Sequence, residues 1–156
     1  MRQVRVSAHQ FSLGPFGVTP VIDPAHLGPL VALGDGGTVP IVYTGIADGR
    51  VWVEVSALNQ TPDPFTALPA GWEVGEEVSI DVGGPLHLDN PISPEGGRAA
   101  YEPRVSGPHR LRVLARGRGA QFDLVDEDAT EEYLLQLWPE PGPRVRITLG
   151  SDGIAL

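Results

Sequence analysis

The residues best equipped for chemistry in this sequence are carboxylates gathered within a stretch of ten positions. They are Asp123, Asp126, Glu127, Asp128, Glu131 and Glu132. Negative charges this close repel one another, so the stretch must be well solvated or offset by positive charge. It can be read as a solvated loop, as a surface that imitates the charge of nucleic acid for a partner, or as a calcium site at Asp126 and Asp128.

The calcium interpretation lacks support, because the central glycine and final glutamate of an EF-hand loop are missing at their required positions. We therefore predict a partner-binding surface rather than a metal site. The main contacts are expected to be Asp126, Glu127, Asp128 and Glu131. Opposite charge on the partner would speed association and make the rate sensitive to salt.

Arginines form a second pattern in the later half of the chain. Those considered are Arg110, Arg112, Arg116, Arg118, Arg144 and Arg146. A basic stripe can bind phosphate, but the formal net charge of the chain is −9. We therefore predict that these arginines pair across neighbouring strands with Glu131, Glu132 and the acidic stretch, each pair contributing roughly 0.2–1 kcal/mol.

The residue types argue against several kinds of catalysis. The sequence has no cysteine, and its four histidines lack the spacing of zinc ligands. It contains no GxSxG nucleophile motif and neither of the glycine-rich phosphate-binding motifs, GxGxxG and GxxxxGK[ST]. We predict that the protein is not an enzyme and uses no metal or cofactor.

Length and charge limit the organisation of the chain. Its 156 residues suit one domain, residues 1–156, which would bury roughly 68% of its unfolded surface. The acidic balance argues against direct binding to nucleic acid. The N-terminus lacks the apolar run of a signal peptide, and no run of 18 apolar residues occurs. We expect a cytoplasmic protein without membrane contact.

Apolar and polar residues alternate in several short segments, as expected for half-buried strands. These segments are residues 2–13, 38–44, 51–58, 76–82, 109–116 and 144–149. The alternation places Val145 toward the core and Arg110 toward solvent. The 20 glycines and 16 prolines lie between such segments, which is typical of strands joined by turns.

Two segments have helical features. Residues 131–138 place apolar side chains on one face of either a helix or a strand. Pro139 leaves room for about two helical turns, less than the mean helix of about 11 residues, so we predict a strand. Asp23 and Pro24 favour a single helical turn, with Asp23 as its cap and Pro24 at its first position.

The pattern predicts an all-β fold with at most one short helical turn. We expect about eight strands in a two-layer antiparallel β-sandwich, with a barrel as the alternative. Residues 89–98 should form a polar loop, and residues 150–156 should fray.

The positions of the tryptophans are compatible with a ligand-binding site. Trp52 and Trp138 fall on strand faces opposite to those assigned to the core, and Trp72 follows a proline-bearing loop. Exposed tryptophans can serve as a platform for sugars or as a protein hot spot, although they also pack beneath loops.

Two short segments resemble the competence protein J family. They are the run SAHQFSL at residues 7–13 and the run GPHRLRV at residues 107–113. Residues 112–139 also resemble a pattern in uncharacterised actinobacterial proteins. The first resemblance implies a β-sandwich that binds and inhibits a nuclease by occupying the groove meant for DNA. Residues 123–132 could supply the carboxylates.

We therefore predict an acidic protein-binding module, acting as an inhibitor or immunity-type factor for a nuclease or toxin. A carbohydrate- or small-ligand-binding module and a structural protein that forms oligomers are the alternatives. The sequence does not determine the oligomeric state.

Overall fold

The computed structural model describes residues 1–90 and 97–154, and this part of the chain is all-β. Its helical structure is one short 3-10 turn, η1 (Pro24–His26). The strands, in chain order, are β1 (Arg2–Ser7), β2 (Gln10–Gly14), β3 (Val31–Gly34), β4 (Val39–Tyr43), β5 (Asp48–Ala57), β6 (Val74–Val82), β7 (His87–Asp89), β8 (Gly107–Arg116), β9 (Val125–Asp126), β10 (Glu132–Pro139) and β11 (Ile147–Gly150). None of the described residues form a helix long and apolar enough to cross a membrane.

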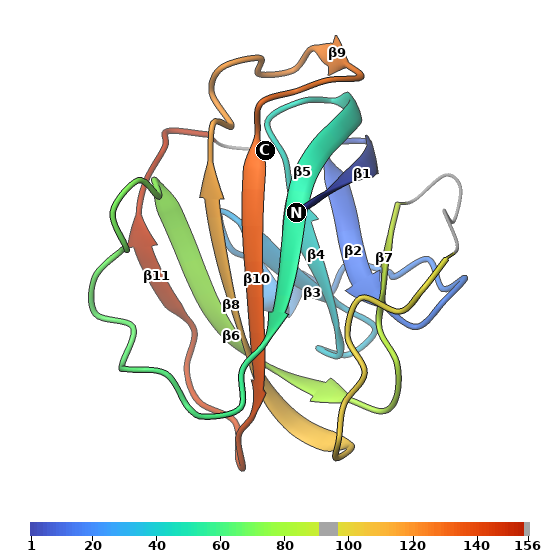
Figure 1. Cartoon of the computed structure of the whole chain (residues 1–156), viewed down its shortest axis with the longest axis vertical. Helices are drawn as coiled ribbons and strands as arrows, with labels where there is room; N and C mark the ends of the chain where they lie inside the picture. The colour runs from blue at the N-terminus through green and yellow to red at the C-terminus, as the bar shows by residue number, and fades with distance from the viewer. Residues whose placement is uncertain (91–96, 155–156) are drawn as a thin grey trace.

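The strands form one sheet, which curls into a half-barrel (Figure 1). Their order in the described residues is β11-β6-β8-β10-β5-β1-β2-β4-β3, with β7 paired to β2 and β9 paired to β5. The all-β prediction is confirmed. The predicted two-layer antiparallel sandwich is corrected, because a single sheet is present and β9 and β10 both run parallel to β5.

The parallel pairing of β5 and β10 has a clear basis in the chain. Parallel neighbours need a long connection, and more than 70 residues separate these two strands. The register places Tyr133 beside Val53 and Leu135 beside Val55, which brings the apolar faces of both strands to one side. Alternation identifies such faces, but it does not tell which strands will be neighbours.

The concave side of the sheet carries the core. Residues 131–138 were predicted to form a strand, and the structure confirms it as β10. In this strand Tyr133, Leu135 and Leu137 are fully buried, whereas Leu134 and Gln136 are half-buried. A period of two separates buried from partly exposed residues, as the strand interpretation requires.

The two ends of the curled sheet meet at a buried carboxylate. Glu76 of β6 is fully buried, and its Oε1 accepts hydrogen bonds of 2.8 Å from the backbone N–H groups of Leu30 and Val31, at the start of β3. Its Oε2 accepts from Arg146 at 2.9 Å and from the Thr148 hydroxyl at 2.7 Å. We call this group of residues the Glu76 clasp, because it joins the β3 end to the β6–β11 end.

Close approach at the clasp explains the glycine at position 28. A Cβ atom added to Gly28 would lie 2.6 and 2.7 Å from the two carboxylate oxygens of Glu76. It would also collide with the Arg146 guanidinium. A side chain at residue 28 would therefore force the hydrogen-bonded groups of the clasp to shift.

A second buried carboxylate, Glu77, overturns the prediction for Arg110. This arginine was expected to face solvent, but it is fully buried, and its Nε lies 3.0 Å from Glu77 Oε1. Its other nitrogens donate to the carbonyls of Arg144 and Val145. β11 begins after these two residues, at Ile147. Val145, predicted to be in the core, is 83% exposed.

The predicted helical turn is confirmed. Asp23 precedes η1, and its side chain accepts a 3.0 Å hydrogen bond from the backbone N–H of Ala25. The fraying predicted for residues 150–156 is wrong at Asp152, which is held by two hydrogen bonds from Arg118. Most of the predicted polar loop (residues 91–96) and residues 155–156 lie outside the described residues.

Removing the Glu76 side chain should destabilise the fold strongly. We expect Glu76→Ala to lower the free energy of unfolding by about 3–5 kcal/mol, because it strands an arginine and two buried N–H groups. Urea unfolding followed by tryptophan fluorescence measures this loss. Glu54→Ala, at an exposed position, should cost no more than about 0.5 kcal/mol. Equal losses in the two variants would contradict the clasp.

Candidate functional site

The acidic loop, residues 117–131, connects β8 to β10 and stands beyond one end of the half-barrel, where β9 lies at the top of Figure 1. Backbone hydrogen bonds fasten it to the connection between β4 and β5. The N–H of Asp123 donates to the carbonyl of Gly45, and the N–H of Ala47 donates to the carbonyl of Leu124, both at 2.8 Å. The sheet therefore sets the position of the loop.

Gly49 lets the loop come close to β5. Its φ is +133°, in a region that side-chain-bearing residues rarely adopt. A Cβ atom at this position would collide with the carbonyl of Asp126, the residue paired with Gly49. The short parallel contact between β5 and β9 thus depends on a glycine.

Two of the predicted carboxylates lie over the outer side of β1. Glu127 Oε2 is 2.9 Å from an Arg5 nitrogen, and Asp128 Oδ1 accepts from the Gln3 amide at 3.3 Å. The Glu127 side chain remains 59% exposed. Exposed pairs of this kind contribute about 0–1 kcal/mol. They orient the loop, and its carboxylates remain able to bind other cations.

Asp123 and Asp126 lie on the same loop but have different surroundings. Asp123 Oδ1 is 2.8 Å from His9 Nε2, and its side chain is 69% exposed. Asp126 accepts hydrogen bonds from the Gln121 amide and from the backbone N–H of Asp128. Asp123 is therefore open to a partner, whereas Asp126 stabilises the loop itself.

The remaining two predicted carboxylates lie apart from this surface. Glu131 is fully buried, and it accepts hydrogen bonds from the N–H groups of Gly45 and Ile46 and from the Tyr133 hydroxyl. The prediction that Glu131 contacts a partner is therefore wrong. Glu132 is half-buried on β10 and lies 2.7 Å from Arg116.

The predicted pairing of the arginines with the acidic stretch holds only for Arg116 and Glu132. The other arginines of that group pair with carboxylates outside the acidic stretch, such as Glu76 and Glu77. Arg118 is fully buried, bonded to Asp152 and to the carbonyls of Pro29 and Tyr43. These arginines hold the structure together and do not form a phosphate-binding stripe.

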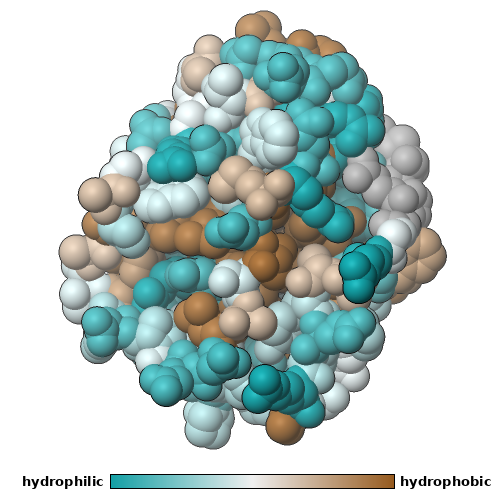
Figure 2. Space-filling model, viewed as in Figure 1, coloured by the Kyte–Doolittle hydropathy of each residue, from teal (hydrophilic) through white to brown (hydrophobic). Residues whose placement is uncertain are grey.

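Sequence reasoning missed the apolar residues of the acidic loop. Phe122 is 42% exposed, Leu124 57% and Val125 73%. Figure 2 shows brown apolar atoms at the top of the molecule, over β9, next to teal hydrophilic atoms. The signal was present in the sequence, because Phe122-Asp-Leu-Val-Asp places large apolar residues inside a charged run.

The tryptophans do not form a common platform. Trp138, predicted to face outward, is 1% exposed and lies 5.4 Å from the Arg112 guanidinium. Trp72 is half-buried, with the Arg116 guanidinium 4.4 Å from its ring centre. Arginines thus cover two of the three indoles.

Among residues 1–90 and 97–154, no three histidine, aspartate or glutamate side chains are placed to share a metal ion. No protein-family model matches the chain, and no curated protein or solved structure was found to be similar to it. The fold and the surface define an all-β half-barrel with an acidic, partly apolar loop at one end. The resemblance to the competence protein J family stays a prediction.

The buried position of Glu131 predicts a specific pH dependence. Burial raises the pKa of its carboxyl above the ordinary value of 4.5, despite the hydrogen bonds that favour the charged form. A raised pKa in the folded state stabilises the protein at low pH, and this stability is lost as the pH rises through the folded pKa.

We therefore expect the stability of the wild type, relative to Glu131→Gln, to fall as the pH is raised from the ordinary carboxyl pKa of 4.5 toward neutrality. Urea unfolding of both proteins across this range measures the difference, and all other titrating groups are common to the two. A difference that stays constant or grows with pH would be the opposite result.

Proposed function

We propose that this chain is an acidic protein-binding module whose acidic loop docks on a basic surface of another protein. The observation that carries the proposal is the exposure of Phe122, Leu124 and Val125 between carboxylates on a loop held by the sheet. Large apolar side chains beside charged ones resemble the centre and rim of a protein interface.

The apolar residues would supply most of the affinity. Burying an exposed side chain of this size contributes about 1.5–3 kcal/mol, so Leu124 and Val125 together can anchor a partner. Their backbone positions are set by β9 and by the bond from Ala47 to Leu124, which limits the ordering cost of binding.

The carboxylates would increase the rate of association and determine which partner binds. Asp123, Glu127 and Asp128 are all exposed, and the chain as a whole carries a formal charge of −9. Such a surface attracts a basic protein over a distance and repels an acidic one. Arg5 and His9 now contact Glu127 and Asp123, and a partner's cations would compete for the same carboxylates.

The particular partner that we propose is a nuclease or toxin whose nucleic-acid-binding groove is basic. A protruding loop with carboxylates on its outer side can enter a groove built for phosphates and exclude the substrate. The module would then act as an inhibitor or an immunity-type factor.

The docking surface can be located by site-specific crosslinking. A photoreactive residue at position 125 should capture a basic protein, whereas one at the comparably exposed Val105 should not. Equal capture at the two positions would place the contact elsewhere. Stoichiometric addition of the module should then block the nuclease or toxin activity of the purified partner, and full activity in the complex would refute inhibition.

The electrostatic contribution is tested with a charge-matched pair of double variants. Glu127→Gln with Asp128→Asn should slow association with the purified partner about ten-fold at low salt. Glu54→Gln with Glu102→Gln changes the net charge equally at other exposed positions and should have a smaller effect. Stopped-flow measurements across a salt series give the rates. Association that is insensitive to salt and to the first double variant would count against the proposal.

A further inference from the structure

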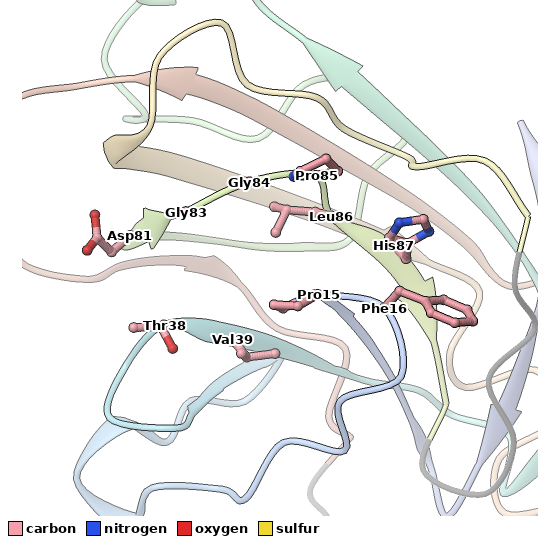
Figure 3. Close-up of a pocket in the computed structure, with 10 residues that line it drawn as sticks. All are labelled: Pro15, Phe16, Thr38, Val39, Asp81, Gly83, Gly84, Pro85, Leu86 and His87. Carbon is pink, nitrogen blue, oxygen red and sulfur yellow. The ribbon is translucent and has the colours of Figure 1, made fainter.

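A second surface feature lies at the other end of the half-barrel from the acidic loop. A hollow of about 620 Å³ opens between the start of β4 and the segment that links β6 to β7 (Figure 3). Most of its lining is apolar, and the apolar side chains in it are those of Pro15, Phe16, Val39, Pro85 and Leu86. Its size falls within the range of about 300–1,000 Å³ that is typical of ligand sites.

The hollow continues along β6. A neighbouring hollow of about 370 Å³ shares Thr38 and Asp81 with the first and extends past Ser79 toward Pro143. Together they form a trough, which is longer than a compact ligand needs. Among the described residues β11 pairs only with residues 74–77 of β6, so the last part of this strand has a neighbour only in β8. An extended chain suits both the shape and the open strand edge.

The charge of the trough determines which kind of extended peptide it can bind. Asp81 is exposed where the two hollows meet, and neither lining contains an arginine. A basic side chain would therefore be attracted to the trough, and an acidic one would be repelled.

An unpaired nitrogen marks the other end of the trough. Figure 3 shows His87 and Asp81 at opposite ends of the first hollow. The Nδ1 atom of His87 is buried and has no hydrogen-bond partner among residues 1–90 and 97–154. Leaving such an atom unpaired costs about 1–3 kcal/mol. A ligand's hydrogen bond would recover this cost once the side chains that cover the nitrogen move aside.

An exposed aromatic ring accompanies that nitrogen. Phe16 is 57% exposed, and its ring meets His87 edge-on, with 5.4 Å between the ring centres. A second aromatic ring can pack against this pair. A phenolic hydroxyl can both donate and accept, so it can bond to Nδ1 in either tautomer of the imidazole.

We propose that the trough binds a short extended peptide that carries a basic side chain at Asp81 and a tyrosine-like side chain beside Phe16 and His87. This site is separate from the acidic loop and does not depend on the function proposed for that loop. The side chains that cover His87 Nδ1 move aside on binding, so that the hydroxyl of the peptide bonds to this nitrogen, and the cation of the peptide pairs with the Asp81 carboxylate.

The glycines of the trough allow a clean blocking variant. Gly84 lines the hollow, and a Cβ added there would have no atom within 4 Å, so Gly84→Phe places a bulky side chain at the hollow without a clash at Cβ. Gly119, on the acidic loop, has the same open surroundings and serves for the matched control Gly119→Phe. Asp81→Asn removes the charge at an exposed position.

The probes are acetylated and amidated peptides in which one arginine and one tyrosine are separated by one to four alanines. Binding is followed by backbone amide shifts in two-dimensional NMR spectra of the full chain. We expect at least one peptide to give saturable shifts at Thr38, Asp81 and His87, with a Kd of about 1 mM or tighter. Asp81→Asn, or glutamate in place of the peptide arginine, should weaken it about ten-fold. Phenylalanine in place of tyrosine should weaken it about five-fold.

Gly84→Phe should abolish the shifts, and Gly119→Phe should leave them unchanged. The proposal is overturned if no peptide gives saturable shifts at these residues, or if Gly84→Phe binds as the wild type does. It is also overturned if tyramine alone binds as tightly as the best peptide, since the ligand would then be a small aromatic amine. None of these results bears on the acidic loop.

Discussion

The architecture depends on the carboxylate of Glu76. It occupies the place where backbone hydrogen bonds between the two end strands would close the sheet into a barrel. A curled sheet closes fully when its first and last strands share backbone hydrogen bonds. Here the N–H groups of Leu30 and Val31 are bonded instead to Glu76, a side chain from the opposite end of the sheet. Because Arg146 and Thr148 bind the other oxygen, the charge is paired and the site is satisfied. The curl brings β4 opposite β6, and the trough lies between them.

The pairing of charges inside the protein also determines the potential at its surface. At least eight of the eleven arginines form ion pairs, and Arg110 and Arg118 do so in full burial. Arginines used in this way contribute little positive potential outside. Most basic groups of the chain are paired within its own structure, so the negative charge of the acidic loop is not neutralised and dominates the potential around that loop.

Alternation in the sequence predicted most of the longer strands, but it missed β3 and β9 and wrongly placed Val145 in the core. The pattern Asp23-Pro24 predicted the turn η1. These are local features, set by residues close together in the chain. The parallel pairing of β10 with β5 and the clasp at Glu76 depend on residues far apart, so no local pattern contains them. The placement of Glu131 failed for a related reason. Its backbone hydrogen-bond donors, Gly45 and Ile46, lie 86 and 85 residues away.

The two surfaces proposed for binding stand at opposite ends of β2. Its first residues follow His9, which contacts Asp123 of the acidic loop, and its last residue precedes Pro15 and Phe16 of the trough. Between them Phe11 and Leu13 are fully buried. Coupling between sites is carried by elements that have two arrangements, and the burial of these side chains gives no sign of a second one in β2. The structure therefore favours two sites that act independently, one suited to a basic protein surface and one to an extended basic peptide.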